Sequence, residues 1–274
     1  MKKILLSTLV FTTAASLLSA EDAPRPLFDG KSLTGWHIPE RKETDKDYAT
    51  KENFFVKDGA IHCYQLPNKK GGIILTDEEF SEFELEMDFK SDWGCDSGIF
   101  IHCNEQGQGI QILNDYLKDG CVGFGFGSGM GGFISRPILL NEVDGKIVAR
   151  DSYDAVEKDG LLYAIDASGW NKMWKTDDWN RIRIRCVGDA PHITTWINGV
   201  KVMEMDGTTY KARSLKDETE KNWDAPSAWD SDKVRETTGG KGSIALQIHV
   251  GGRWKQGGSA AYRNITIKEL DSKP

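Results

Sequence analysis

The stretch "FELEMDF", residues 83–89, shows most clearly what kind of fold this chain adopts. Apolar residues occupy every odd position of the stretch, and acidic residues occupy every even position. Successive side chains of a β-strand point to opposite faces of the sheet. The pattern therefore predicts a strand that buries one face in a core and exposes the other to solvent.

The carboxylates of this strand raise the question of glycoside hydrolysis, which uses paired carboxyl groups. Laminarinase-type glucanases of sandwich fold carry the order Glu-x-Asp-x-x-Glu, whereas this chain has Glu84-x-Glu86-x-Asp88. The order differs, and apolar residues stand between all three. We therefore interpret these carboxylates as the solvated face of a strand.

Further along the chain, short strand-like runs are separated by turn signals. Asp58-Gly59 and Asn198-Gly199 each stand between two such runs, and both dipeptides favour the two-residue turns of β-hairpins. No segment has a long apolar period of 3.6 residues, so the chain is predicted to be an all-β sandwich of antiparallel sheets. Residues 117–160, which include "GCVGFGFGSGMGG", do not read as strands and are predicted to be a loop insertion at the rim of a site.

The N-terminal twenty residues have the pattern of a signal peptide. Two lysines precede an apolar run that ends in small residues before "EDAPRP", which predicts cleavage after Ala20. The run is too short, and too soon followed by charge and proline, to predict a membrane span. We expect an exported protein, periplasmic or secreted, whose residues 21–274 form one domain.

The acidic balance excludes some partners. The formal net charge is -7, and it becomes about -9 without the two lysines of residues 1–20. Such a charge disfavours nucleic acid and anionic membranes as partners. The five cysteines have no zinc-site spacing, and their odd number leaves at least one thiol unpaired, so we expect buried free thiols.

A polar face is predicted near the end of the chain. In "IALQIHVGG", residues 244–252, alternation places Gln247 and His249 on one face of a strand. The same argument assigns polar side chains to three other strands, namely Asp96 and His102, Gln111, and Arg263. Buried polar groups carry a penalty unless they are paired, so a sheet face that combines them is expected to line a cleft for a polar ligand such as a sugar.

Several motifs, in this order along the chain, resemble the 3-keto-disaccharide hydrolase family. They include "LFDGKSLTGWH", "DSGIFIHC", "GIQILND", "WINGVKV", "GSIALQIH" and "YRNITIKEL", and the resemblance covers residues 26–270. It implies a concanavalin-like fold, a jelly-roll sandwich of two curved antiparallel sheets. It also implies a glycoside substrate that is already oxidised at carbon 3 of the glucose ring.

The chemistry implied by this resemblance begins with a ketone that acidifies the hydrogen on carbon 2. A general base removes that hydrogen, donors stabilise the enediolate, the aglycone leaves by β-elimination, and water adds. The expected roles are His249 as the base with His102 as second candidate, Arg263 and Gln247 as donors, Asp96 as the group that orients or ligates, and Gln111 as a hydroxyl contact. A divalent metal held by Asp96 with either histidine would also stabilise the enediolate, although no motif demands one.

Two departures from the family pattern favour an alternative function. Gly109 stands where the family usually has a glutamate, and Asn114 stands where it usually has an aspartate. A chain that lacks these carboxylates could bind carbohydrate without turnover. A non-catalytic, lectin-like module is therefore the second hypothesis.

Overall fold

The computed structural model describes residues 23–40, 51–128, 133–158, 160–210, 213–214 and 229–270. The expected signal peptide, residues 1–20, lies outside the described residues. No helix within the described ranges is long and apolar enough to cross a membrane.

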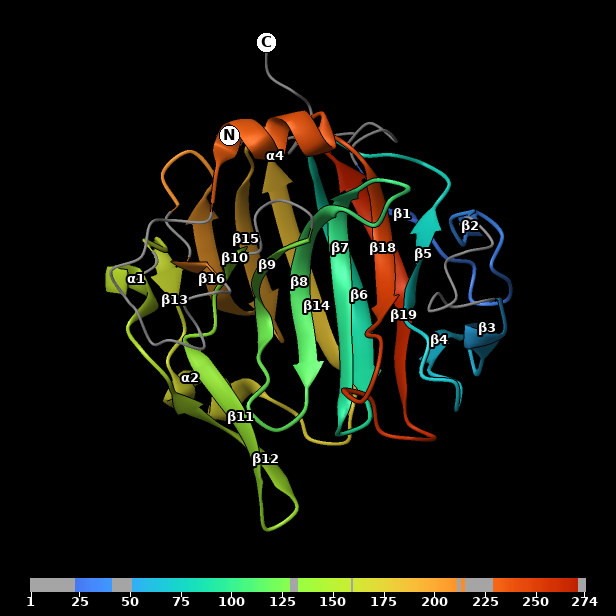
Figure 1. The fold of residues 1–274 in the computed structure, drawn as a ribbon, viewed down its shortest axis with the longest axis horizontal. Coiled ribbons are helices and arrows are strands. Elements are labelled where there is room, and N and C mark those ends of the chain that lie inside the picture. Colours follow the sequence, from blue (N-terminus) through green and yellow to red (C-terminus); the bar gives the residue numbers. More distant parts are fainter. Residues whose placement is uncertain are drawn as a thin grey trace, which may run out of the picture.

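Two antiparallel sheets lie face to face, as predicted (Figure 1). In the described part of the chain, nine strands form the sheet called sheet A here. In spatial order they are β13 (Tyr163–Ala164), β16 (Val200–Asp206), β15 (His192–Ile197), β14 (Asn180–Val187), β6 (Phe83–Ser91), β19 (Ser259–Glu269), β4 (Ala60–Tyr64) and β3 (Phe54–Lys57), with β1 (Arg25–Pro26) beside β19.

The facing sheet, called sheet B, has eight strands among the described residues. In spatial order they are β17 (Arg213–Ser214), β10 (Phe133–Ile134), β9 (Val122–Ser128), β8 (Gly109–Tyr116), β7 (Cys95–Cys103), β18 (Ser243–Ile248), β5 (Gly72–Thr76) and β2 (Trp36–His37). Outside the sheets lie the hairpin β11 (Ile138–Val143) and β12 (Lys146–Asp151), and the short helices η2 (Lys51–Asn53), α1 (Ala155–Lys158), α2 (Ala167–Met173) and α4 (Ser231–Thr238).

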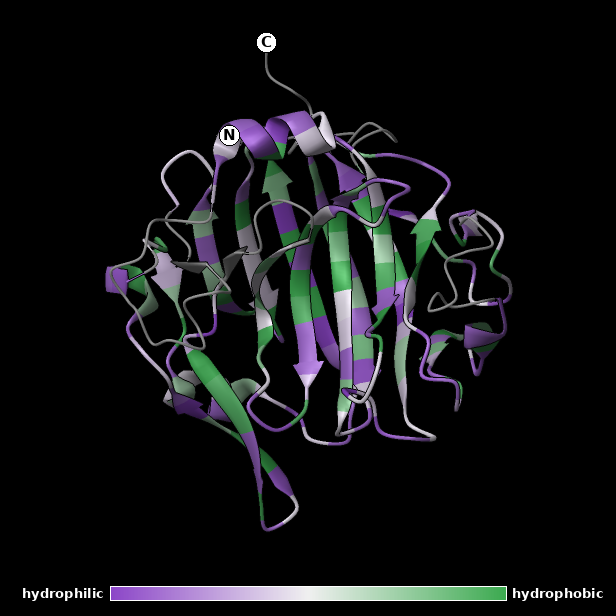
Figure 2. Ribbon diagram, in the orientation of Figure 1, coloured by the Kyte–Doolittle hydropathy of each residue, from purple (hydrophilic) through white to green (hydrophobic). Residues whose placement is uncertain are grey.

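The alternation of β6 has the predicted consequence. Its apolar residues are buried in the core between the sheets, and its acidic residues lie half-buried on the outer face of sheet A. Figure 2 shows the same alternation of apolar and polar bands along the central strands. Glu86 and Asp88 both form ion pairs with Arg181 of the neighbouring strand β14. These carboxylates therefore belong to a solvated sheet face, as interpreted from the sequence.

Both predicted hairpins are present. Asp58 and Gly59 join β3 to β4 with φ angles of 50° and 73°, and Asn198 and Gly199 join β15 to β16 with φ angles of 51° and 82°. Positive φ at both central residues matches the twist of the flanking strands, which is why these dipeptides suit the turn. All five cysteines are buried with free thiols, as expected.

The expectation that residues 117–160 contain no strands is wrong. This stretch includes β9, β11 and β12, and the glycine-rich run "VGFGFGS" is β9, which pairs with β8. Gly123 in β9 has a φ of +92°, and a Cβ there would lie 2.9 Å from Cγ1 of Val202 in sheet A. Glycine therefore allows β9 to approach the opposite sheet, a role that its composition alone does not reveal.

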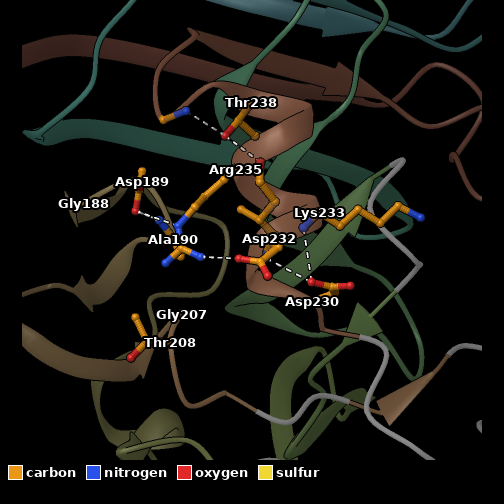
Figure 3. Close-up of polar contacts among 12 residues, drawn as sticks. Gly188, Asp189, Ala190, Gly207, Thr208, Asp230, Asp232, Lys233, Arg235 and Thr238 are labelled. Carbon is orange, nitrogen blue, oxygen red and sulfur yellow. Dashed lines mark hydrogen bonds and ion pairs between the residues drawn. The ribbon is translucent and has the colours of Figure 1, made fainter.

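Helix α4 lies across one end of the sandwich, at the top of Figure 1. The carboxylate of Asp230 caps its N-terminus by accepting hydrogen bonds from two backbone amides, and Gly239 ends it in a left-handed conformation. Arg235 donates to Asp232 on the helix and to Asp189 in the turn between β14 and β15, at 2.8 and 3.1 Å (Figure 3). The helix is thereby tied to sheet A immediately before the chain enters β18.

Candidate functional site

A cavity of about 240 Å³ opens on the face of sheet B that is turned away from sheet A. The opposite face of the same strands carries Ile99, Ile112 and Leu246, which are buried in the core between the sheets. The cavity is lined by Asp96, Gln111, Leu113, Asp115, Phe126, Arg136, Gln247, His249 and Arg253. Four of the six residues predicted from the sequence, namely Asp96, Gln111, Gln247 and His249, thus lie together.

Two amide side chains, from the strands on either side of β7, form the floor of the cavity. Nε2 of Gln111 in β8 donates to Oε1 of Gln247 in β18 at 2.9 Å, and to the backbone carbonyl of Ser97 at 3.3 Å. The bond crosses β7, which lies between these strands, at the position of Gly98. Both amide hydrogens of Gln111 are thereby used, and the amide hydrogens of Gln247 and the oxygen lone pairs that these bonds do not occupy are left for a ligand.

His249, directly after β18, has a defined tautomer. Its Nδ1 lies 2.7 Å from the carbonyl oxygen of Val250, and a carbonyl only accepts, so Nδ1 carries a proton. In the neutral ring, Nε2 then holds the free lone pair, and it has no hydrogen-bond partner among the described residues. Gln65 donates to the His249 carbonyl at 2.6 Å, and the His249 amide donates to the Asp96 carbonyl at 3.2 Å. The backbone of this residue is therefore fixed at the cavity.

Two carboxyl groups face each other beside the amides. Asp96 in β7 and Asp115 in β8 are direct register partners, and each is 2 % exposed. Nε of Arg253 donates to Asp96, and Nη2 of Arg136 donates to Asp115 at 3.1 Å. Burial, and next the negative charge of Asp96, raise the pKa of Asp115 well above its ordinary value, although Arg136 opposes the shift.

His102 does not line the cavity, and its placement corrects the expectation from strand alternation. The residue has a φ of 48°, and the pairing of β7 with β18 shifts between Ser243 and Ala245, which is a β-bulge. The extra residue turns His102 inward, where Nε2 donates to the Ser81 carbonyl at 2.7 Å and lies 3.6 Å from Sγ of Cys186. Burial lowers the pKa of His102, so the ring is a neutral core residue.

Arg263 is also absent from the cavity, and the expectation that it shares one hollow with Asp96 and His249 is wrong. Its strand, β19, belongs to sheet A, where Arg263 stands opposite Asp88 of β6. The guanidinium lies 4.0 Å from the ring centroid of Trp179, and its Nε lies 3.6 Å from the Asp88 carboxylate. Alternation assigned the face of the strand correctly but could not assign the sheet.

Sequence reasoning missed the two arginines and one carboxyl group of the site. Asp115 shares the parity of Gln111 in β8, so alternation alone could have found it. Arg136 and Arg253 lie outside regular strands, where alternation gives no signal. Phe126 of β9 adds an aromatic wall to the cavity, from a stretch that was predicted to be a loop.

The two departures from the family pattern have different structural meanings. A Cβ on Gly109 would lie 2.9 Å from Cα of Cys103, because the bulge at His102 approaches it, so the backbone leaves no room for a glutamate. Asn114 points into the core, where its amide donates to Ser91 at 2.9 Å and to the Tyr262 hydroxyl at 3.0 Å. The carboxyl group at this end of β8 is supplied instead by the next residue, Asp115.

The donor set does not fit the divalent metal considered from the sequence. No group of three or more His, Cys, Asp or Glu side chains gathers in metal-binding geometry within the described residues. The Asp96 carboxylate is bound by Arg253, and His102 lies between the sheets. The pairing of Asp96 with His102 as metal ligands is therefore wrong.

Solved structures of low identity resemble this chain. Two proteins of Parabacteroides distasonis ATCC 8503, provisionally described as glycosyl hydrolases, share 17 % and 21 % identity, cover 93 % and 86 % of this chain and 99 % of their own, and give TM-scores of 0.49 and 0.46. The carbohydrate binding module CBM66 of Bacillus subtilis shares 9 % identity, with 86 % of this chain and 96 % of its own covered and a TM-score of 0.38. Sequence identities this low do not show which substrate this chain acts on. Among curated protein sequences, none matches this chain.

The sequence profile of one family, by contrast, covers almost the entire described chain. It matches residues 23–268, which include both sheets and all nine residues that line the cavity. The match agrees with the resemblance found in the sequence motifs, and it relates the chain to carbohydrate chemistry. The chain belongs to the 3-keto-alpha-glucoside-1,2-lyase-like domain family.

Proposed function

We propose that this protein cleaves 3-keto-glycosides in the cavity of sheet B, by proton abstraction at carbon 2, β-elimination of the aglycone and hydration of the product. The observation that carries the proposal is His249, whose Nδ1 proton is bound to a backbone carbonyl while its Nε2 lone pair is free at the cavity. An imidazole with a free nitrogen lone pair can act as a general base.

The first step forms an enediolate. Nε2 of His249 takes the proton from carbon 2, and the electron pair moves toward the carbon 3 oxygen. That oxygen becomes negative and needs donors that are in place before the reaction. The guanidinium of Arg253 and the amide of Gln247 supply donors in this cavity, so Arg253 takes the role that was expected for Arg263.

The lining also suits a sugar ring. Phe126 and Leu113 offer apolar surface for the C–H groups of the ring, and the glutamine amides offer donors and acceptors for its hydroxyl groups. Specific recognition of small ligands commonly combines an apolar wall with a few placed polar groups. A neutral glycoside is thus the substrate class that the cavity favours.

The test is to incubate the purified protein with a 3-keto-disaccharide in D₂O. The wild type should release the aglycone and incorporate deuterium at carbon 2, above the level of a sample without enzyme. His249→Gln should lose both signals by at least about 10²-fold while remaining folded by circular dichroism. Arg263→Gln, on the opposite sheet, is the matched control and should keep both. Undiminished activity in His249→Gln would remove this residue from the mechanism.

The second candidate function is carbohydrate binding without catalysis. It is favoured by Gly109, which supplies no carboxylate where the family usually has a glutamate and where the backbone of Cys103 leaves no room for one. Under this hypothesis, calorimetry would detect binding of an unmodified oligosaccharide, and the bound sugar would be recovered intact after long incubation with the wild type. Release of an aglycone from the keto-sugar would exclude it.

Export remains part of the proposal. The pattern of residues 1–20 supports cleavage after Ala20 and a periplasmic or secreted location. Mass spectrometry of the protein from the periplasmic fraction of an expressing bacterium should give a chain that begins at Glu21. A chain that keeps Met1 and stays in the cytoplasmic fraction would contradict export.

A further inference from the structure

The carboxyl pair of Asp96 and Asp115 has no assigned role in the proton abstraction described above. The two side chains meet across adjacent strands within hydrogen-bonding reach, and each is 3 % exposed. Oδ2 of Asp115 accepts from Arg136 at 3.1 Å. Oδ1 of Asp115 is buried and has no hydrogen-bond partner among the described residues.

The unpaired oxygen is best explained by a proton. Two carboxylates side by side in a buried site repel each other, so one of them keeps its proton. Asp96 is the ionised member, because Nε of Arg253 binds it and Nη2 of the same arginine lies 3.6 Å from Asp115. A proton on Oδ1 of Asp115 satisfies this otherwise unpaired buried atom, either toward Asp96 or toward a ligand in the cavity.

We propose that Asp115 is the catalytic acid of the cleavage, delivering its proton to the glycosidic oxygen as the bond from carbon 1 to that oxygen breaks. This inference rests on the proposed function, for which it names the leaving-group step. Asp96 is a positioning residue, because its charge keeps the proton on Asp115. Nε of Arg253 donates to the Asp96 carboxylate and fixes its position beside Asp115.

The step balances in protons and electrons. His249 has taken the proton of carbon 2, the electron pair forms the double bond between carbons 1 and 2, and the aglycone leaves as an alcohol with the proton of Asp115. In the hydration, the Asp115 carboxylate takes a proton from the water that adds to carbon 1. The His249 imidazolium returns its proton to carbon 2, so both groups regain their starting states. No oxidant or metal is consumed.

The test uses two 3-keto-glucosides with different leaving groups. 4-Nitrophenolate leaves without protonation, whereas methanol needs an acid. Asp115→Asn should cut cleavage of the methyl 3-keto-glucoside by about 10²–10⁴-fold and that of the 4-nitrophenyl compound by less than about tenfold, with deuterium exchange at carbon 2 retained. An equal loss on both substrates would overturn the role of Asp115. Absence of exchange and cleavage in the wild type would refute the proposed function itself, and the acid with it.

A second measurement needs no folded Asp115 variant. In the wild type, cleavage of the methyl compound should fall at high pH as Asp115 loses its proton, while cleavage of the 4-nitrophenyl compound should not show this decline. The charged and titratable groups that face Asp115 are Asp96 from β7, Arg136, Arg253, His249 at the end of β18 and the buried thiol of Cys121. Asp96→Asn should shift the decline to lower pH, since it removes the charge that retains the proton. Identical declines for both substrates would overturn the proposal.

Discussion

Gly98 lies directly beneath the side-chain amide of Gln111, so that a Cβ at position 98 would stand 2.1 Å from Nε2 of Gln111. The amide can lie across β7 only because residue 98 has no side chain. In that position it reaches both Gln247 of β18 and the carbonyl of Ser97. The glycine of "DSGIFIHC" therefore shapes the floor of the cavity, although it contributes no polar group itself.

Gly98→Ala is expected to push the Gln111 amide off the floor and to break its bond with Gln247. Loss of a hydrogen bond of this kind costs about 1 kcal/mol, so KM for the keto-sugar should rise about five- to tenfold with a smaller effect on kcat. Gln111→Ala should have a similar effect. The double variant should be no worse than Gln111→Ala alone, because both changes remove the same contact. Additive losses in steady-state kinetics would show that Gly98 acts in another way.

Arg253→Gln is expected to weaken both stability and activity. The substitution leaves the Asp96 carboxylate, which is 2 % exposed, without its charged donor. A buried charged group that loses its partner costs about 1–3 kcal/mol, which urea unfolding should register. Adding Asp96→Asn should recover part of this loss, because the unpaired charge is then removed. Arg263→Gln, a partly exposed residue on the outer face of sheet A, should stay within about 1 kcal/mol of the wild type. Equal losses of unfolding free energy in Arg253→Gln and Arg263→Gln would contradict the placement of Arg253 beside the buried Asp96 carboxylate.

Alternation within single strands predicted most of the fold and part of the site. It identified the core face of β6, and it placed Gln247 of β18 on the same side as His249, which directly follows this strand. It could not show that β7 pairs with β18, about 150 residues further along the chain, because strand order arises from packing of the whole sandwich. Gln111, Asp96 and His249 could therefore be proposed as neighbours only through the idea of a shared polar face.

The errors have local physical causes. His102 was placed on the outer face because the bulge before it inverts the alternation, and nothing in "GIFIHC" marks a left-handed residue. Arg263 was placed at the site because alternation does not say to which sheet a strand belongs. Arg136 and Arg253 come from segments between strands, where the position of a side chain depends on the path of the loop.

Tyr262→Phe is expected to destabilise the protein without removing a group from the cavity. The hydroxyl group of Ser97 donates to the Gln247 carbonyl at 2.6 Å, so Tyr262 donates its own proton to Ser97, and it accepts from Asn114. This network joins β19 of sheet A to β7 and β8 of sheet B inside the core. Phenylalanine removes both bonds and leaves buried polar atoms with fewer partners, which should lower the free energy of unfolding by about 1–3 kcal/mol. Thermal unfolding of wild type and Tyr262→Phe would measure this loss of stability, and an unchanged Tm would contradict the network.

His37→Gln is expected to reduce stability at acidic pH only. Burial alone would lower the pKa of His37, but Glu105 at 2.9 Å and Asp77 at 2.7 Å outweigh it and raise the pKa. A histidine with a raised folded pKa stabilises the protein fully below its unfolded pKa of about 6.5, and this contribution is lost as pH rises through the folded value. All three side chains are more than one-third exposed, so the contribution at pH 5.5 is below about 1 kcal/mol and falls with added salt.

The measurement for His37 is the difference in unfolding free energy between wild type and His37→Gln at pH 5.5 and 8.5 in low salt. The difference should be present at pH 5.5 and vanish at pH 8.5. His62 provides the contrast, because burial lowers its pKa, so that its protonation opposes folding. Relative to the wild type, His62→Gln should therefore be more favourable for the free energy of unfolding at pH 5.5 than at pH 8.5. A pH-independent difference for His37→Gln would show that Glu105 and Asp77 do not stabilise the charged ring.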